Sequence, residues 1–505
     1  NMTKPSEQLY LSYALVGSDG RSLRPAYLIR LVQKLFPKLE VEYPEREPVA
    51  KQLAGSRDGM RFLVDYLREY AARRLDEADT RTLYTFYHCY RREESCREEV
   101  ERLAQTAFFR YEGEQLSALV TRALYGSVLQ NSVSRLERYA ACAYAHFLQY
   151  GLALKERGEF TFEDVDMGNV FHGVLEIFSR RLGERGHTWF DFPEQDAAAM
   201  IDEALEEYAV SYGHTILYSS ARNQHLLKRI VRILNRTVRT LQKQLQKGAF
   251  VPEQFEMSFS VLEDLDSLNI ALSEQEKMHL RGRIDRIDTC ESGDKVYVKV
   301  IDYKSGSRKF DLAALYYGLQ LQLVVYMNAA VEAEQKKHPD KEIVPAAMLY
   351  YHVADPMIED GERLTEEELN RQILRELKMT GVVNEDERAV GLLDREFTDK
   401  SEILPLERKK DGSYSSYSSV ISDGDMKTVS AYVDHKIREI GRGILGGNIA
   451  TDPCEQGGSL SCTYCAYRNV CGYDERIEGY RTRKLPKLSW DEALEKMQET
   501  LEKEK

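Results

Sequence analysis

Hydrophobic and polar residues follow two different periods along the chain, and the change of period divides it into regions. Up to about residue 126, apolar residues recur three or four positions apart, as in Met60–Leu75, which predicts mostly helical structure. Small and polar residues at Tyr125–Ser134 predict a boundary. We therefore expect a helical region at 1–126, a larger unit at 127–480 and a C-terminal amphipathic helix within 481–505.

Within the larger unit the period switches from helix to strand and back. Helices are expected at Ser134–Tyr150 (capped by Ser134), Met167–Leu182, Asn223–Lys247, Tyr316–Ala333 and Met426–Gly441, with a tail helix at Ser489–Glu504 capped by Ser489. Strands are expected at Glu256–Leu262, Met278–Asp288, Lys295–Tyr303 and Ala346–Val353. This order predicts an α/β core in which helices flank a mixed sheet.

Composition excludes several classes of protein. Apolar residues make up 43% of the 505 positions, which is enough for sizeable cores, and no apolar stretch approaches the ~20 residues of a membrane span. The first residues lack the basic segment and apolar core of a secretory signal. We expect a soluble, cytoplasmic protein without a membrane partner, and the initial Asn suggests part of a longer chain.

Charge is unevenly distributed. The net charge of −13 argues against a general nucleic-acid binder, yet no Asp or Glu lies between Tyr208 and Pro252. Five basic residues share one face of the helix expected there: Arg229, Arg232, Arg236, Arg239 and Lys243. The opposite face is apolar: Ile230, Leu234, Val238, Leu241 and Leu245. A solvated helix face usually mixes signs, so the absence of acids favours contact with the phosphates of single-stranded DNA.

Two expected strands carry carboxylates and a lysine in a chemically meaningful pattern. Asp302 and Lys304 project to one face, with Tyr303 opposite, and a hairpin turn within Thr289–Asp294 can bring Asp285 beside Asp302. Two adjacent carboxylates repel each other unless a cation lies between them, and oxygen ligands suit Mg²⁺ or Mn²⁺. A neighbouring ammonium can orient water or offset charge on phosphorus, so the grouping fits metal-assisted phosphodiester hydrolysis.

Charged outer faces of two exposed strands are the alternative interpretation. The apolar residues Val298, Val300 and Ile301 before Asp302 argue against it, because they predict a strand that is at least half buried.

This pattern resembles the PD-(D/E)xK nuclease superfamily, and in particular its RecB-type branch. Gly168–His172 (GNVFH), Gln322–Tyr326 (QLVVY) and Glu256 at the start of the first core strand match further elements of that branch. The resemblance implies a restriction-endonuclease-like core. The catalytic residues that it implies are Asp285, Asp302, Lys304, Gln322 and Tyr326, and the ligands for Mg²⁺ or Mn²⁺ are His172, Asp285, Asp302 and the backbone carbonyl of Tyr303.

Cysteines crowd near the C-terminus. Cys462, Cys465 and Cys471 form C-x2-C-x5-C, and Cys454 lies eight positions before the first of them. Without a secretory signal, such spacing indicates metal ligands rather than disulfides. These four residues suit zinc, whereas three local thiolates and a distant one suit a [4Fe–4S] cluster.

A second resemblance concerns Cys142. Its segment RYAACAYAHF resembles the cysteine-bearing helix of the AddB-type components of bacterial AddAB helicase–nucleases. In that family C-x2-C-x5-C after the core completes an iron–sulfur cluster. The resemblance implies that Cys142, Cys462, Cys465 and Cys471 are ligands of a [4Fe–4S] cluster. Such a cluster would join Cys142 to Cys462, 320 positions later in the chain.

The opening of the chain, Leu9–Pro37, also resembles the helicase-like portion of AddB, which makes 1–126 a helical remnant of that portion. The chain contains no G-x-x-x-x-G-K-[ST] motif, in agreement with the resemblance. The family resemblance implies a metal-dependent exonuclease that resects double-strand DNA ends for recombinational repair, cuts the 5′-terminated strand and pairs with an AddA-type subunit as a heterodimer.

Two other functions remain open. One is a standalone CRISPR-associated RecB-like iron–sulfur exonuclease, although such proteins are much shorter. The other is a non-catalytic DNA-binding scaffold with a degenerate nuclease fold, which the intact Asp285, Asp302 and Lys304 disfavour. Replacing Asp302 with Ala separates these classes, since only a nuclease loses cleavage while keeping DNA binding.

Overall fold

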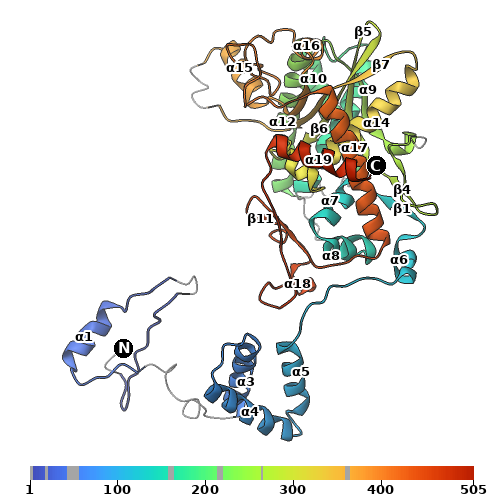
Figure 1. Cartoon of the computed structure of the whole chain (residues 1–505). Helices are drawn as coiled ribbons and strands as arrows, with labels where there is room; N and C mark the ends of the chain where they lie inside the picture. Colours follow the sequence, from blue (N-terminus) through green and yellow to red (C-terminus); the bar gives the residue numbers. More distant parts are fainter. Residues whose placement is uncertain are drawn as a thin grey trace. The chain divides into compact units, whose positions relative to one another are not determined.

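The computed structural model of the chain describes residues 4–17, 21–42, 56–156, 164–212, 220–262, 265–358 and 364–504 (Figure 1). The chain divides into two units, Asn1–Phe109 and Arg110–Lys505. Among the described residues, no helix is both long and apolar enough to cross a membrane.

The first unit is helical, as its hydrophobic period predicts. Its helices are α1 (Tyr27–Leu35), α3 (Ser56–Ala71), α4 (Glu77–Arg92) and α5 (Arg97–Ala107). A small core joins the last three through the buried side chains of Leu63, Leu67, Leu83 and Val100. The carboxylate of Asp76 caps α4 by accepting a hydrogen bond from the backbone N–H of Asp79, which fixes where that helix begins.

The second unit is built on a six-stranded mixed sheet in the order β2-β5-β6-β7-β8-β9. Its strands are β2 (Val251–Ser258), β5 (Arg283–Ser292), β6 (Lys295–Lys304), β7 (Glu342–His352), β8 (Thr380–Asn384) and β9 (Val420–Ile421). Strands β2, β5 and β6 are successively antiparallel, whereas β6 and β7 are parallel. A parallel pair needs a crossover, and two helices supply it: α13 (Leu312–Tyr316) and α14 (Gln322–Lys337).

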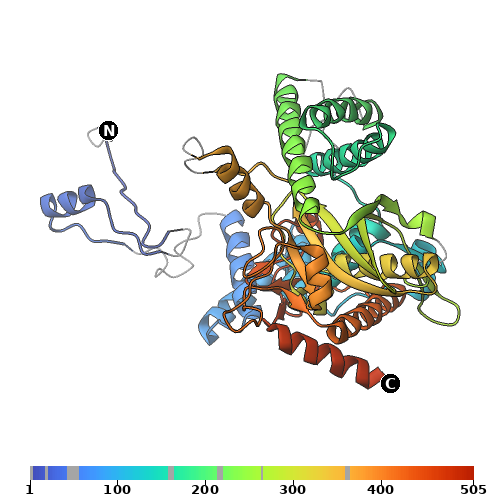
Figure 2. The same cartoon turned by 90° about the horizontal axis from the view of Figure 1, so that it is seen from above.

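Helices cover both faces of this sheet (Figures 1 and 2). One core lies under α9 (Asp164–Glu184), α10 (Glu194–Tyr212), α12 (Ala221–Gln246) and α16 (Glu387–Leu393). The other lies under α7 (Val133–Ala141), α14, α17 (Asp423–Leu445) and α19 (Trp490–Glu504). Strand β6 alternates between them, because Ile301 and Tyr303 enter the first core and Val298 and Val300 the second. The expected α/β architecture is therefore confirmed.

Shorter elements complete the second unit. Two three-stranded sheets are formed by β1 (Val128–Asn131), β4 (Lys277–Leu280) and β3 (Asn269–Ala271), and by β11 (Ser459–Leu460), β10 (Cys454–Gln456) and β12 (Arg483–Leu485). The remaining helices are α6 (Ala118–Tyr125), α8 (Ala143–His146), a π-helix at Phe147–Gly151, a 3-10 helix at Phe259–Leu262, α15 (Glu366–Glu376) and α18 (Arg468–Cys471). The segment before α6 packs within this unit, since Tyr111 Oη accepts a hydrogen bond from the backbone N–H of Thr451.

The expected helix at Ser134–Tyr150 differs from the structure in two ways. Its cap is Ser132, whose hydroxyl accepts a hydrogen bond from the backbone N–H of Arg135, and Ser134 lies in the first turn. The helix is also interrupted at Cys142, where the backbone is extended (φ −166°, ψ 115°). Arg483 Nη2 donates to the carbonyl of Ala140 at 2.6 Å, so a segment far along the chain ends α7 at this point.

Several other boundaries also differ from the prediction. The segment Met278–Asp288 forms two strands, β4 and β5, that belong to different sheets. Helix α10 and strand β8 are additional elements that the hydrophobic period did not indicate. The tail helix is confirmed: Ser489 Oγ accepts from the backbone N–H of Glu492, whose carboxylate accepts from the N–H of Ser489.

Candidate functional site

Strands β5 and β6 bring Asp285 and Asp302 side by side, as the expected hairpin requires. Their register pairs Arg286 with Ile301, so the next pair toward the strand ends joins the two aspartates. The backbone N–H of Tyr303 donates to Asp285 Oδ2 at 2.7 Å. Both aspartates are buried, at 6% and 1% exposure. Local strand geometry thus builds a buried pair of carboxylates.

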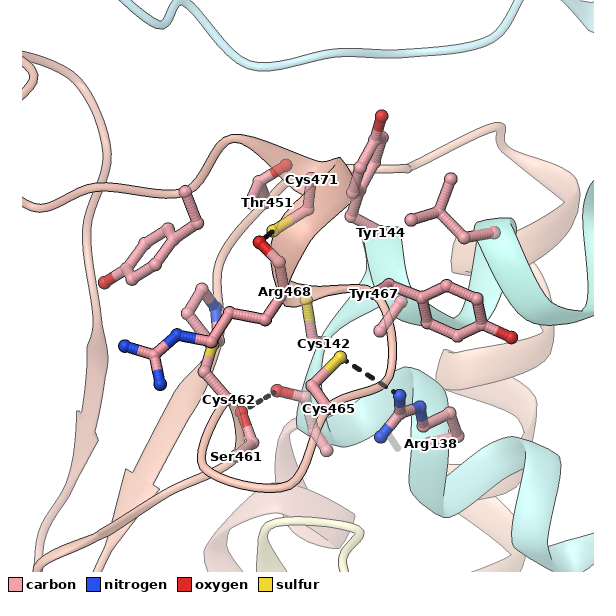
Figure 3. A pocket seen from close by; sticks show the side chains of 15 residues that line it. Arg138, Cys142, Tyr144, Thr451, Ser461, Cys462, Cys465, Tyr467, Arg468 and Cys471 are labelled. Atoms are coloured by element: carbon pink, nitrogen blue, oxygen red, sulfur yellow. Dashed lines mark hydrogen bonds between the residues drawn. The ribbon is translucent and has the colours of Figure 1, made fainter. Parts of the chain in front are cut away.

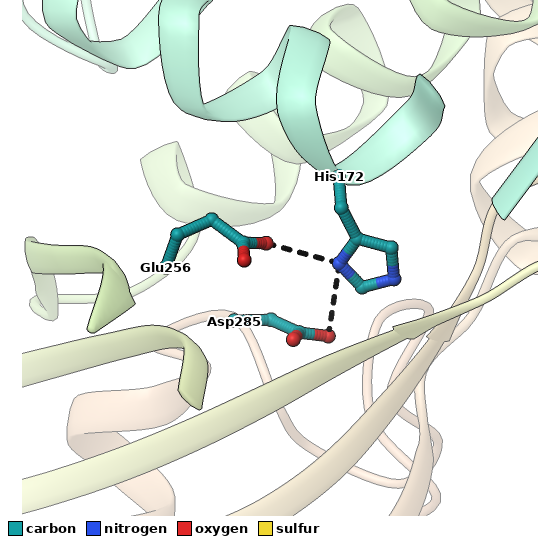
Figure 4. Close-up of side chains that lie close together, drawn as sticks. All are labelled: His172, Glu256 and Asp285. Atoms are coloured by element: carbon teal, nitrogen blue, oxygen red, sulfur yellow. Dashed lines mark hydrogen bonds and ion pairs between the residues drawn. The ribbon is translucent and has the colours of Figure 1, made fainter. Parts of the chain in front are cut away.

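His172 and Glu256 complete this group (Figure 4). His172 projects from α9 so that its Nδ1 lies 3.0 Å from Glu256 Oε1 and 3.4 Å from Asp285 Oδ2. One potential ligand atom from each of the three residues lies within 4.8 Å of the others. Glu256 adopts a positive φ of 47°, an uncommon backbone conformation for a residue with a side chain, and such strain often marks a functional site.

The charges of this group attract protons. Burial raises the pKa of Asp285 well above its usual value, and the adjacent Asp302 adds to the effect. Burial lowers the pKa of His172, but its hydrogen bond to Glu256 and the charges of Asp285, Glu256 and Asp302 outweigh this and raise it to about 9. The raised pKa of His172, in spite of its burial, indicates negative potential from the carboxylates around it, which a bound cation would relieve.

Asp302 is the more deeply buried of the two aspartates and has the fewer polar partners. Neither of its carboxylate oxygens accepts a hydrogen bond, and Lys304 Nζ lies 2.5 Å from Oδ2 as an ion-pair partner. A buried carboxylate with unused lone pairs is costly unless a further cation satisfies it. One imidazole nitrogen and three carboxylates form a donor set that suits Mg²⁺ or Mn²⁺, so these residues fit a divalent metal.

Lys304 is linked to helix α14 through a chain of side-chain hydrogen bonds. Its Nζ donates to Gln322 Oε1 at 3.0 Å, and Gln322 Nε2 donates to Tyr326 Oη at 2.8 Å. Burial, with the charges of Asp285 and Asp302, raises the pKa of Tyr326, so this hydroxyl stays protonated. The structure therefore brings together all five residues for which the sequence predicted a catalytic role.

The second aspartate of strand β5, Asp288, lies on the other face of the sheet. Arg286 forms a two-pronged ion pair with Asp288, at 2.6 and 2.9 Å, and Lys299 Nζ lies 2.8 Å from the same carboxylate. Arg286 also donates to the hydroxyl of Tyr303 at 3.5 Å. The Tyr303 side chain thus points away from Asp302, as strand alternation predicts, and its ring packs edge-to-face against the imidazole of His172, with the ring centroids 6.1 Å apart.

Helix α12 carries the basic face expected at Asn223–Lys247, and the apolar stripe predicted opposite it is buried. Tertiary contacts partly neutralise the basic residues. Arg232 Nε lies 2.6 Å and Arg236 Nε 3.5 Å from the carboxylate of Asp355, and Arg239 pairs with Glu194. Arg229 and Lys243 are exposed.

Four cysteines from distant segments line one cavity (Figure 3). Cys142 comes from the break between α7 and α8, Cys462 and Cys465 from the turn after β11, and Cys471 from the end of α18. Burial and the neighbouring thiols of Cys142, Cys465 and Cys471 raise the pKa of Cys462 to about 11. Thiols that disfavour one another's charge suit a site for a cationic metal centre.

The spread of these sulfurs bears on which centre they suit. A zinc ion bound at about 2.3 Å holds tetrahedral thiolates about 3.8 Å apart. Among the described residues, no three cysteine sulfurs lie within 4.8 Å of one another. Cys454, which the zinc alternative requires, is buried in β10 and does not line the cavity. As the structure describes them, these sulfurs do not form the close set that a single zinc ion requires.

The sequence patterns did not predict some of the contacts in these two sites. The pattern indicated Glu256 only as a supporting acid, because nothing local shows that a positive φ turns it toward His172. Arg138, which donates to Cys465 Sγ at 3.3 Å, lies 327 positions from that cysteine. Glu137 precedes Arg138 on α7, and the sequence did not indicate a role for it beyond its place in a cysteine-bearing helix.

Comparisons with known proteins extend this picture. The family model described as the PD-(D/E)XK nuclease superfamily matches residues 130–472. The chain is 37% identical to a protein of Lachnoclostridium phytofermentans over 98% of the chain and 42% of that relative. For a relative from Alkaliphilus metalliredigens the values are 33%, 99% and 44%, and for one from Bacillus cereus 31%, 99% and 43%.

All three relatives are named as the B-type subunit of an ATP-dependent helicase/deoxyribonuclease. The chain spans less than half the length of each of these relatives. The family model covers the sheet, the convergent acidic group and all four cysteines that line the cavity.

Proposed function

Because the chain belongs to the PD-(D/E)XK nuclease superfamily, we propose that its second unit is a metal-dependent deoxyribonuclease within a larger helicase–nuclease. The observation that carries this proposal is the convergence of His172, Glu256 and Asp285 beside the buried Asp302–Lys304 pair. A non-catalytic scaffold is disfavoured, because a buried acidic cluster is costly without a cation to bind. A standalone CRISPR-associated exonuclease is disfavoured by the names of the relatives.

The metal ligands in this proposal are His172, Glu256, Asp285 and Asp302, together with the backbone carbonyl of Tyr303. Mg²⁺ or Mn²⁺ bound there supplies Lewis-acid stabilisation of phosphate oxygens and lowers the pKa of attacking water. The carboxylates would hold this metal where strand β5 begins and strand β6 ends.

Lys304 contributes the remaining positive charge. Its ammonium orients the attacking water and stabilises negative charge that accumulates on the phosphate in the transition state. Gln322 holds the ammonium through its side-chain oxygen, and Tyr326 in turn holds the amide of Gln322. This arrangement keeps the lysine directed at the site before DNA arrives.

The wider role that we propose takes the helicase/deoxyribonuclease assembly from the names of the relatives and the remaining features from the resemblance to AddAB helicase–nucleases. The nuclease acts as an exonuclease on linear DNA in the cytoplasm, within a heterodimer with an AddA-type helicase–nuclease subunit, and it resects double-strand ends for recombinational repair. We assign it the 5′-terminated strand. A single strand delivered from the duplex end is the substrate.

We also propose a [4Fe–4S] cluster bound by Cys142, Cys462, Cys465 and Cys471. Support comes from the shared cavity and from the finding that, among the described residues, no three cysteine sulfurs lie within 4.8 Å of one another. Its role is structural: it joins the segment before the sheet to the segment after it, and DNA engagement depends on that junction.

Cleavage of linear duplex DNA is the direct test of the proposed nuclease. The intact chain, alone and with a helicase partner subunit, is incubated with end-labelled DNA and ATP in the presence of Mg²⁺, Mn²⁺ or a chelator. Release of nucleotides that needs a divalent metal and that degrades the 5′-terminated strand is expected. DNA binding without release under any of these conditions would favour the scaffold alternative.

The basic face of α12 is proposed to contact DNA phosphates, and Arg229 tests this. Replacing Arg229 with Gln is expected to weaken single-stranded DNA binding and to reduce the slope of log K against log salt by about 1, because one phosphate contact is lost. Fluorescence anisotropy over a range of salt concentrations measures both. Arg185, which pairs with Glu203 on another helix, is the control, and an Arg229→Gln slope equal to that of Arg185→Gln would contradict the proposal.

A further inference from the structure

Beside the proposed nuclease site lies another carboxylate, Glu137 on helix α7, whose side chain is 17% exposed. Its Oε1 accepts a hydrogen bond from the backbone N–H of Leu321 at 2.8 Å, and Arg308 Nη2 lies 3.8 Å from Oε2. Burial raises the pKa of this carboxyl, whereas Arg308 and the N–H groups of Leu321 and Gln322 oppose the rise. Glu137 therefore contacts the beginning of α14 from a helix that lies 184 positions earlier in the chain.

Helix α14 lacks a cap of its own. Its N-cap residue is Leu321, which offers no side-chain hydrogen bond, and its first turn contains no acidic residue. The first N–H groups of a helix have no partner within the helix, and a negative charge near them is favourable. The Glu137 carboxylate supplies both the acceptor and the charge.

The first residue of α14 is Gln322, whose side chain receives the Lys304 ammonium. The backbone position of Gln322 therefore decides where its Oε1 lies. Close packing fixes α7 against the turn that precedes α14, because a Cβ at Gly318 would lie 3.1 Å from the Cβ of Ala140. A side chain on α7 can thus hold the start of α14 in register with strand β6.

We propose that Glu137 is a positioning residue of the nuclease site, which caps α14 so that Gln322 holds Lys304 beside Asp302; this inference rests on the proposed function. Glu137 does not touch the reacting groups. It acts through the backbone of Leu321 and Gln322, and its effect on cleavage passes through the Gln322 side chain.

Four variants of the intact protein test this: Glu137→Ala, Glu137→Gln, Gln322→Ala and the double variant Glu137→Ala/Gln322→Ala. In Glu137→Ala the single-turnover cleavage rate is expected to fall about 10- to 100-fold while DNA affinity changes less than about twofold. Glu137→Gln is expected to recover part of the rate, because its amide oxygen still accepts from Leu321. The double variant is expected to cleave no more slowly than Gln322→Ala, since both changes remove one interaction.

Glu332, which lies on helix α14, provides a matched control. Its carboxylate also accepts from two backbone N–H groups, those of Asp266 and Ser267, at 2.8 and 2.9 Å, but it holds a different loop. Glu332→Ala is expected to lower the thermal midpoint as Glu137→Ala does, without lowering the cleavage rate. Equal losses of rate in the two variants would show a general stability effect and overturn the inference.

Two further results for these variants would contradict the positioning role of Glu137. Additive losses in the double variant, or a wild-type rate in Glu137→Ala, would overturn the positioning role. A parent protein that never cleaves DNA would refute the proposed function instead. In that case a crystal structure of Glu137→Ala still tests the inference: Gln322 Oε1 is expected to leave Lys304 Nζ, and an unchanged 3.0 Å contact would overturn it.

Discussion

Replacing Asp302 with Asn is expected to abolish DNA cleavage and, at the same time, to stabilise the metal-free protein. The change removes one of two adjacent buried carboxylates and, with it, a proposed metal ligand. Loss of a single preorganised electrostatic group costs about 10²- to 10³-fold in rate, and Asp302 also pairs with Lys304, so we expect a loss of at least about 10³-fold. A gel assay of linear DNA cleavage measures it, with single-stranded DNA affinity unchanged.

The stabilisation follows from the same charges. Asp302 accepts no hydrogen bond, and its charge adds to burial in raising the pKa of Asp285, so neutralising it relieves repulsion. A gain of about 1 kcal/mol would raise the thermal midpoint by about 2–4 °C in a chelator, and added Mg²⁺ should raise the midpoint of the parent but not of the variant. A variant that still cleaves, or that responds to Mg²⁺ as the parent does, would contradict this role for Asp302.

Asp288 is the matched comparison, because it is as deeply buried but lies on the opposite face of the sheet. Its carboxylate balances Arg286 and Lys299, so Asp288→Asn leaves two buried cations without a partner. Breaking such a pair costs about 3–5 kcal/mol. The two aspartate variants are therefore expected to shift the thermal midpoint in opposite directions, which a general intolerance of this region to substitution would not produce.

Replacing Cys142 with Ser is expected to have the largest effect on stability. It removes the one proposed ligand that lies before the sheet, so iron content should fall from about four per chain toward zero, together with the absorption band at about 400 nm. A cross-link that closes a loop of some 320 residues stabilises by about 6 kcal/mol if unfolded-chain entropy alone is counted. We expect a loss approaching that size in anaerobically purified protein.

Cys454 separates this outcome from the zinc alternative. It is buried in β10 outside the cavity, so Cys454→Ala should keep the absorption band and the iron content. Zinc analysis of the parent and of both variants completes the test. A colourless parent that holds one zinc, lost in Cys454→Ala but retained in Cys142→Ser, would refute the iron–sulfur assignment.

The sequence by itself determined the chemistry of the strands. The alternation of side chains along a strand has a period of two that holds in any sheet, so the pattern around Asp302 was enough to place Lys304 on its face and Tyr303 opposite. The short turn between β5 and β6 fixed their register, and with it the pairing of Asp285 and Asp302. The roles expected for His172, Gln322 and Tyr326 came instead from the resemblance to the RecB-type branch, because a local period alone does not distinguish them from packing residues.

Only the tertiary structure decided which charges meet. Asp355 neutralises Arg232 and Arg236, although no acid lies near them in sequence, and Arg483 ends α7 at the turn before Cys142. Glu137 reaches Leu321 across 184 positions. A local pattern specifies the direction of a side chain but not its partner, because the partner is set by how distant elements pack. The candidate residues of the site could therefore be predicted from the sequence, whereas the contacts that hold them in place could not.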